Sequence, residues 1–309
     1  MRSSGKFRQK LNDILFSHPV ATGLCVILLL IAVLALCWNL GSEHDEGKLM
    51  IRDYPASEEE LRLDFPYIAP TELDRIVTPV DPLSYSLSEC NGDLAINAGG
   101  DYILSGELRG SVIINAPEQN VHLFLNNAVI SALVGPAIHC IAADKLTVTL
   151  LPGTENRVTD SGRYDVKTDP LACIYSVSDI TFNGSGSLSV SGLYKDAIRS
   201  KDIIKILSGD YSIRCKRTAI HGNDGIFISG GSFSIQSEKY GLKTENRGPD
   251  GRGNLMIVGG DLELVAGRYS FVVELGDLYV YDCSVFHRSL VELYDCGGRV
   301  MIAQGCVQR

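Results

Sequence analysis

The sequence predicts an all-β fold, a right-handed parallel β-helix of about 22 residues per coil with a transmembrane helix at its N-terminal end. First, residues 198–213 can be laid over residues 220–235 at a shift of 22, and such self-similarity at a fixed period is the signature of a solenoid. Second, each copy alternates apolar with small polar residues between glycine-containing turns, which indicates short strands. Third, residues 20–40 form a nearly unbroken apolar run that is long enough to span a bilayer.

The repeat defines the predicted coils of residues 87–309. At roughly 3.3 Å per residue, one repeat suffices for three short strands and three corners, and neighbouring coils stack about 4.8 Å apart. Equivalent residues of successive copies then lie on top of one another, and each coil needs its neighbours to bury its inward side chains. Residues 271–309 repeat less clearly and are predicted to be degenerate coils or a cap. The predicted inward column consists of Ile198, Ile220, Leu242 and Phe271.

Residues 1–86 divide into three predicted segments. Residues 1–19 are basic and acidic residues follow the apolar run 20–40, so the positive-inside rule places the N-terminus in the cytoplasm. No small-residue cleavage site follows the run, which favours an uncleaved signal anchor. Residues 41–86 are charged and contain prolines, as expected of an extracytoplasmic spacer. We therefore expect a single-pass protein of the cell membrane whose C-terminal domain lies outside the cytoplasm.

The net charge limits the classes of binding partner, and the cysteine spacing indicates no metal-binding motif. The chain has 28 Lys and Arg against 37 Asp and Glu, and a net charge of −9 argues against nucleic acid as a partner. Nothing in the sequence predicts an oligomeric state.

No two of the cysteines form a C-x-x-C pair or a zinc-ligand spacing. Cys283, Cys296 and Cys306 cluster near the C-terminus, where one disulfide can form in an oxidising compartment, and the sequence leaves their state open.

Several ordered blocks between about residues 100 and 264 resemble one known family. They include Gly100-Asp-Tyr-Ile-Leu-Ser-Gly106, Leu151-Pro-Gly-Thr-Glu-Asn156 and His221-Gly-Asn-Asp224. These blocks are similar to those of a carbohydrate-binding parallel β-helix family, whose clostridial members bind polygalacturonate and carry calcium. The resemblance implies a non-catalytic protein that binds an acidic, uronic-acid polysaccharide.

The resemblance also implies where calcium would bind. The family has acidic residues two positions before the inward column, and here that column reads Asp196, Thr218, Tyr240 and Tyr269, so only one carboxylate is kept. A second acidic column contains Asp202 and Asp224. Calcium requires six to eight oxygen ligands, of which these side chains supply part. The predicted metal ligands are Asp196, Asp202, Asn223 and Asp224, and the alternative is that these residues cap turns by bonding backbone amides.

The change from acidic to aromatic residues in the first column predicts a sugar-binding surface. Flat phenol rings suit stacking against sugar rings, and nearby cations suit the carboxylates of a uronic acid. The alternative is that the aromatic rings only cover the corners of the coils. His221 lies near the acidic residues and is expected to be solvated. The predicted carbohydrate-binding residues are Tyr194, Arg199, Lys201, Tyr240, Lys243, Arg252 and Tyr269.

Two further classes of function stay open. The inserted loop of residues 244–253 contains Arg247-Gly-Pro-Asp-Gly-Arg252, which matches an R-x-P-x-x-R string of a calcium-dependent polysaccharide lyase family, where an arginine acts as the base. The other sequence blocks of that family are missing, so we expect no enzyme. The remaining alternative is a structural or adhesive surface spacer that binds no sugar.

Overall fold

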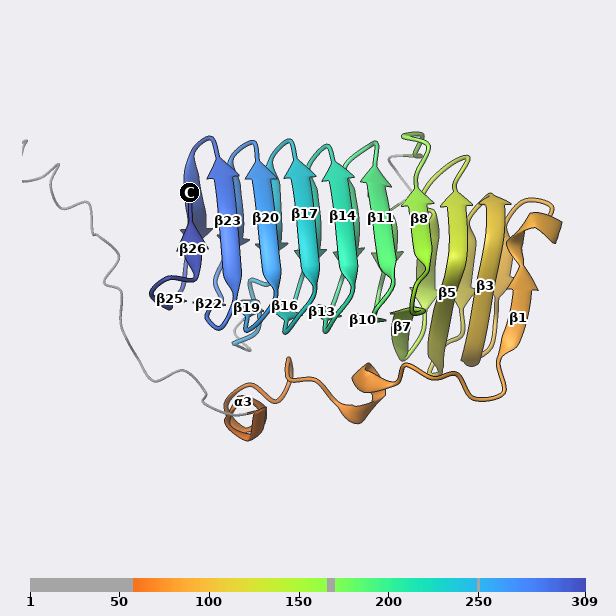
Figure 1. Ribbon diagram of the computed structural model, residues 1–309, viewed down its shortest axis with the longest axis horizontal. Coiled ribbons are helices and arrows are strands. Elements are labelled where there is room, and N and C mark those ends of the chain that lie inside the picture. The colour runs from red at the N-terminus through yellow and green to blue at the C-terminus, as the bar shows by residue number, and fades with distance from the viewer. Residues whose placement is uncertain (1–57, 166–169, 249–250) are drawn as a thin grey trace, which may run out of the picture. The chain divides into compact units, whose positions relative to one another are not determined.

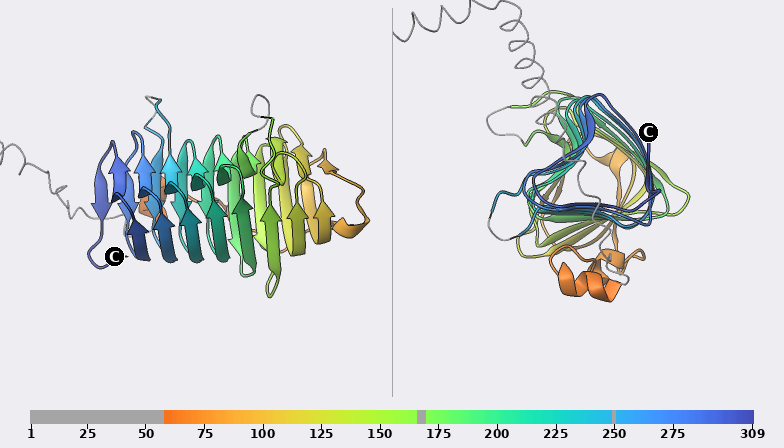
Figure 2. Two further views of the ribbon diagram at one scale, coloured as in Figure 1. Left: turned by 90° about the horizontal axis from the view of Figure 1, so that it is seen from above. Right: turned by 90° about the vertical axis from the view of Figure 1, so that its left-hand side faces the viewer.

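The structure is a computed structural model that describes residues 58–165, 170–248 and 251–309 (Figure 1). Within them the chain winds through successive coils, and every strand pairs in parallel with the equivalent strand of the next coil. The end view shows three walls (Figure 2), and buried apolar side chains pack between them. We name the walls the strap face, the groove face and the nine-stranded sheet.

The strands of the three walls follow one another in each coil. The strap face contains β1 (Leu83–Ser86), β7 (Lys145–Leu150), β10 (Asp179–Gly184), β13 (Ile203–Ile206), β16 (Gly225–Ile228), β19 (Asn254–Ile257), β22 (Leu278–Val280) and β25 (Val300–Ile302). The groove face contains β8 (Glu155–Thr159), β11 (Ser187–Gly192), β14 (Asp210–Cys215), β17 (Ser232–Ser237), β20 (Asp261–Ala266), β23 (Ser284–Ser289) and β26 (Val307–Gln308). The nine-stranded sheet contains β2 (Leu94–Ile96), β4 (Val112–Asn115), β6 (Ile138–Ala142), β9 (Ala172–Ser176), β12 (Asp196–Ser200), β15 (Thr218–Gly222), β18 (Tyr240–Thr244), β21 (Tyr269–Val273) and β24 (Glu292–Cys296).

The predicted inward column is present in the nine-stranded sheet. Ile198 pairs with Ile220, Ile220 with Leu242, and Leu242 with Phe271, and all four side chains are buried. Each apolar side chain packs on its counterpart in the next coil, because a shift of one residue would turn the whole column outward. The period of the sequence therefore sets the register of these strands.

The predicted fold class is corrected in two respects. Two long strands, β3 (Gly100–Arg109) and β5 (Asn120–Ser131), run through both the strap face and the groove face, so seventeen strands form one near-closed, barrel-like parallel sheet. At the corner between the two faces the register of β3 and β5 shifts between Ser105 and Gly106, because Asn127 is an extra residue in β5, and both Gly106 and Asn127 have a positive φ.

The second correction concerns the transmembrane helix. The helices of the described ranges are short: α3 (Glu58–Asp64), with seven residues, and the 3₁₀ helices η1 (Glu72–Arg75) and η2 (Leu87–Glu89). None of them is long and apolar enough to cross a membrane. The predicted anchor at residues 20–40, and the cytoplasmic segment before it, lie outside the described residues.

The part of the predicted spacer that the structure describes packs on the protein. Residues 58–82, which we name the strap, lie along the outside of the strap face, with α3 over later coils and the other end near β1 (Figure 1). Ile68 of the strap belongs to a second apolar cluster with Phe227, Met256 and Tyr279, which point outward from the sheet. The strap thereby covers an apolar stripe that water would otherwise contact.

One buried carboxylate fastens the middle of the strap. Asp74 of η1 is 0% exposed and forms ion pairs with Lys145 of β7 and Lys205 of β13. It also accepts hydrogen bonds from the Thr181 hydroxyl and from the backbone amide of Thr71 at 2.7 Å. Burial raises the pKa of Asp74, but the two lysines and these hydrogen bonds outweigh it and hold the pKa well below its usual range.

Candidate functional site

Most residues predicted to bind sugar lie on the outer surface of the nine-stranded sheet. Tyr175, Arg199, His221 and Lys243 pair in register on β9, β12, β15 and β18, and their side chains form one outward column. Neighbouring strands lie about 4.8 Å apart, so the three basic side chains of this column are close to one another. Positive charges at such a spacing repel one another, so carboxylates must lie between them to offset the repulsion.

Asp196 supplies one of these carboxylates from the start of β12. Its Oδ1 accepts hydrogen bonds from Arg217 Nε at 2.7 Å and from the Thr218 amide at 3.1 Å. Its Oδ2 accepts one from Arg217 Nη2 at 2.5 Å and lies 3.7 Å from Arg199 Nη1. Burial raises the pKa of Asp196, but the hydrogen bonds from Arg217 and His221 outweigh it and lower the pKa to about 2. The carboxylate is therefore already saturated with donors.

His221 lies between two carboxylates, and the expectation that it is solvated was wrong. The side chain is 2% exposed, with Nδ1 3.1 Å from Asp196 Oδ2 and Nε2 3.2 Å from Glu245 Oε1. The Nε2 contact lacks the alignment of a hydrogen bond. The contact with His221 is the largest cause that holds the pKa of Glu245 well below its usual range.

The cations predicted to meet uronic acid are paired inside the protein. Arg199 Nη2 lies 2.7 Å from Glu245 Oε1, and Lys243 Nζ lies 3.2 Å from Glu245 Oε2 and 3.1 Å from Glu274 Oε1. These contacts neutralise the positive charge that an acidic ligand would need at this surface. Lys201, in the turn after β12, is exposed.

Asp202, Asn223 and Asp224 form a separate cluster at the other end of these strands. Asp224 Oδ2 lies 3.0 Å from Arg252 Nη1, and its Oδ1 accepts hydrogen bonds from the amides of Asn223 at 2.5 Å and Asn246 at 3.0 Å. Asp202 Oδ1 lies 3.9 Å from the same Arg252 nitrogen. Burial, followed by the neighbouring carboxylates, raises the pKa of Asp202 to about 6.

The four predicted calcium ligands are not brought together. Asp196 begins β12, whereas Asp202 follows the end of that strand, and the oxygens of Asp196 and Asp224 already accept bonds from protein donors. Across residues 58–165, 170–248 and 251–309 no three His, Cys, Asp or Glu side chains are grouped to hold a metal ion. As they are paired, these residues do not fit calcium, which needs six to eight oxygens. Calcium binding stays a prediction from the sequence.

The predicted tyrosines form stacks at the corners of the coils. Tyr240 and Tyr269 start β18 and β21, and their rings stack at 6.4 Å with an interplanar angle of 16°. Arg268 lies 5.9 and 5.8 Å from the two ring centroids, and Tyr194 stacks on Tyr164 at 5.0 Å. Because these rings are partly covered by each other and by Arg268, they offer less free surface to a sugar than predicted.

The string that resembles a lyase motif is bound to carboxylates at both ends. Arg247 Nη2 lies 2.9 Å from Glu274 Oε2, and Arg252 Nη1 lies 3.0 Å from Asp224 Oδ2. Both guanidinium groups therefore have carboxylate partners, whereas a general base must be free to reach the proton that it removes. The geometry thus gives the lyase interpretation no support.

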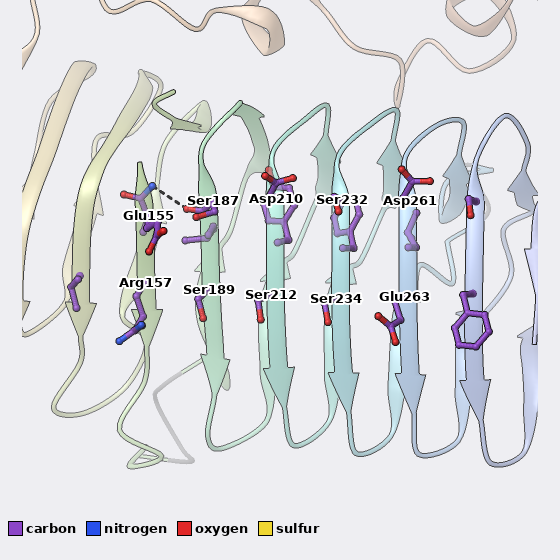
Figure 3. Close-up of a pocket in the computed structure, with 18 residues that line it drawn as sticks. Glu155, Arg157, Ser187, Ser189, Asp210, Ser212, Ser232, Ser234, Asp261 and Glu263 are labelled. Carbon is purple, nitrogen blue, oxygen red and sulfur yellow. Dashed lines mark hydrogen bonds between the residues drawn. The ribbon is translucent and has the colours of Figure 1, made fainter. Parts of the chain in front are cut away.

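A groove that the sequence analysis missed runs along the groove face. It has a volume of about 680 Å³ and crosses β8, β11, β14, β17, β20 and β23 (Figure 3). Its walls are two rows of outward side chains that pair in register from strand to strand. The first row is Glu155, Ser187, Asp210, Ser232, Asp261 and Ser284, and the second is Arg157, Ser189, Ser212, Ser234, Glu263 and Phe286.

The polar groups of this groove are available to a ligand. Among the described residues, the side chains of Ser189, Ser212, Ser234, Asp210 and Asp261 make no hydrogen bond or ion pair with one another or with the rest of the protein. Their spacing of about 4.8 Å from strand to strand repeats along the whole groove. A linear polymer of polar units can therefore meet the same donors and acceptors at each coil.

A second hollow, of about 780 Å³, lies beside the groove on the same face, toward the ends of the groove-face strands. Arg214 of β14 and Arg288 of β23 line it, and Arg288 lies 5.2 Å from the Phe286 ring. Lys216 also lines it but forms a 2.7 Å ion pair with Glu238. The groove face therefore carries acidic side chains at one side and, at the other, Arg214 and Arg288, which form no ion pair with the residues that the structure describes.

The repeat itself carried a signal for this groove. Ser187-Leu-Ser189, Tyr211-Ser212 and Ser232-Phe-Ser234 recur at the same positions of successive copies. Alternation with apolar residues indicates only that these small polar residues lie on the outer side of a strand, but the period also stacks them into columns.

The fold and groove define an all-β scaffold with an open, linear, polar surface. The chain belongs to the family of carbohydrate-binding domain-containing proteins, which it matches over residues 91–274. A carbohydrate-binding domain-containing protein of Acetivibrio thermocellus is 30% identical over 141 residues, or 44% of this chain and 48% of that protein. The chain thus spans about half the length of this curated relative.

A solved structure shares this fold. The chain is similar to the polysaccharide lyase-like protein from C. thermocellum, determined as a gadolinium derivative, with a TM-score of 0.69 and 25% sequence identity. The likeness covers 73% of this chain and 98% of that one. The resemblance to a carbohydrate-binding family predicted from the sequence is therefore confirmed at the level of the family.

Proposed function

We propose that this protein binds polysaccharide along the groove face without cleaving it. The observation that carries the proposal is the pair of in-register rows in which four neighbouring strands present free hydroxyl and carboxylate groups, those of Ser189, Asp210, Ser212, Ser234 and Asp261. Sugar rings present hydroxyl groups at regular intervals, and such groups pair with serine hydroxyls and carboxylates. Membership of a carbohydrate-binding family supports the class of ligand.

We further propose that the ligand is acidic, with uronic-acid units, and that its carboxylates lie toward Arg214 and Arg288. These two arginines line the hollow beside the serine rows, whereas Arg199 and Lys243 on the nine-stranded sheet are neutralised by Glu245 and Glu274. A protein of net charge −9 holds a polyanion only where local cations reverse the field. The two free arginines supply such a place.

Calorimetry on the purified full-length chain tests both parts of the proposal. With polygalacturonate as probe, the Arg214→Gln and Arg288→Gln double variant should weaken binding about tenfold, and the loss should shrink as salt is raised. With a neutral galactan, the Asp210→Asn and Asp261→Asn double variant should weaken binding while the arginine variant does not. Arg247→Gln, an exposed arginine away from the groove, is the matched control.

The outcomes separate the alternatives. If no polysaccharide binds, the protein is a spacer and the proposal fails. If polygalacturonate binds equally well to the wild type and to the Arg214 and Arg288 variant, the proposal of an acidic ligand fails. Binding of the neutral galactan then decides whether the groove is the binding site. Growth of ultraviolet absorbance from unsaturated products on incubation with polygalacturonate would make the protein a lyase.

A further inference from the structure

Three aspartates lie together at the corner between the nine-stranded sheet and the strap face, and two of them, Asp202 and Asp224, stack. Asp179 starts β10, and Asp202 and Asp224 stand directly before β13 and β16 in the next two coils. The Asp224 amide donates to the Asp202 carbonyl oxygen at 3.2 Å, and the Ile203 amide donates to Asp179 Oδ1 at 3.1 Å. Carboxylates stacked at the spacing of coils repel one another unless a positive charge lies among them.

The positive charge at this corner comes from the inserted loop. The spacing from Leu242 to Phe271 exceeds the period of the preceding coils because residues 245–253 are added between β18 and β19. The loop returns to the corner, where the Gly253 amide donates to the Asp224 carbonyl oxygen at 2.7 Å. This contact places Arg252 Nη1 3.0 Å from Asp224 Oδ2 and 3.9 Å from Asp202 Oδ1.

Other contacts hold the guanidinium in place. Tyr67 of the strap lies beneath it, with 5.8 Å between the guanidinium carbon and the ring centroid. The amides of Asn223 and Asn246 bind the second oxygen of Asp224. Both carboxylate oxygens of Asp224 are thus bound by nitrogen donors, which is a donor set suited to an arginine and unsuited to a hard divalent cation.

We infer that Arg252 takes the place of a divalent cation at the stacked aspartates, so that the inserted loop makes this corner independent of metal. The guanidinium screens the repulsion between Asp202 and Asp224, and it joins the corner to the strap through Tyr67. The inference does not depend on which ligand the groove binds.

Thermal unfolding of the full-length chain in calcium chloride and in chelator tests this inference. The wild type should show the same Tm in both solutions. Arg252→Gln should lower the Tm in chelator by roughly 5 °C, because the aspartates lose their counter-charge. Calcium should restore most of that loss, and sodium chloride of equal ionic strength should not, because calcium binds the vacated corner of the folded state.

Three controls keep the test decisive. Arg252→Lys should stay independent of calcium, and Arg247→Gln, in the same loop but away from the aspartates, should behave as the wild type. If Arg252→Gln does not fold, the Asp224→Asn and Arg252→Gln double variant should fold and show no calcium response. A wild-type Tm that rises with calcium and loses this rise in Asp224→Ala would overturn the inference, as would an Arg252→Gln protein whose Tm ignores calcium.

Discussion

Replacing Asp74 tests whether the strap is held by its buried ion cluster. Asp74 is fully buried, and the described part of the chain pairs it with Lys145 and Lys205, whose side chains are 10% and 4% exposed. Asp74→Ala removes the ion-pair partner of both lysines under the strap. Removing one partner of a buried ion pair costs about 3–5 kcal/mol, because the remaining charge stays desolvated.

The expected effect is large enough to measure in two ways. At about 2–4 °C per kcal/mol for a domain of this size, the Tm should fall by about 6–20 °C, and limited proteolysis should cut within residues 58–82 before the coils. Glu72→Ala is the matched control on the same 3₁₀ helix. Glu72 is exposed and pairs with Arg62 at 3.8 Å, so its loss should cost less than about 1 kcal/mol.

A compensating variant separates charge from packing. If uncompensated lysines cause the loss, then Lys145→Met and Lys205→Met in the Asp74→Leu background should recover most of the stability, since a buried ion cluster can be replaced by apolar side chains. An Asp74→Ala protein within about 1 kcal/mol of the wild type, with its strap still resistant to protease, would refute the reasoning.

Two further predictions concern other parts of the molecule. The pKa of Asp196 lies at about 2, below its usual 3.8, so this carboxylate stabilises the folded state above about pH 4 by roughly 2 kcal/mol and loses that contribution as the pH falls toward 2. Asp196→Asn should flatten this part of the dependence of unfolding free energy on pH, and an unchanged slope would contradict the assignment. Cys283 and Cys306 are free thiols that contact each other between the last two coils, so mild oxidation by glutathione disulfide should join them and raise the Tm. Peptide mapping without reductant should show this pair, and a bridge to Cys296 in its place would contradict the prediction.

Local sequence patterns were sufficient to predict the stacking of the coils, but they were insufficient to predict that two of the walls join into one sheet. Ile198, Ile220 and Leu242 stack as predicted, because a period repeated along the chain imposes the same register on every coil. The merging of two walls through β3 and β5 depends on a bulge at Asn127 of β5, opposite Gly106 of β3, where both strands bend and then continue. An isolated glycine within a strand pattern does not say whether the strand bends or ends.

The sequence by itself determined the β-strand repeat, the inward column and the membership of a carbohydrate-binding family, because each depends on residues close together in the chain or on a period. Only the tertiary structure decided the state of the charged side chains. Arg199 meets Glu245 across 46 residues, and Lys145 meets Asp74 across 71. Such pairs depend on the path of the inserted loop and of the strap, which no local pattern specifies. A charged side chain in a column is free to bind a ligand only if those segments place no opposite charge beside it. On the nine-stranded sheet they do place such charges, and for this reason the proposed ligand site lies on the groove face.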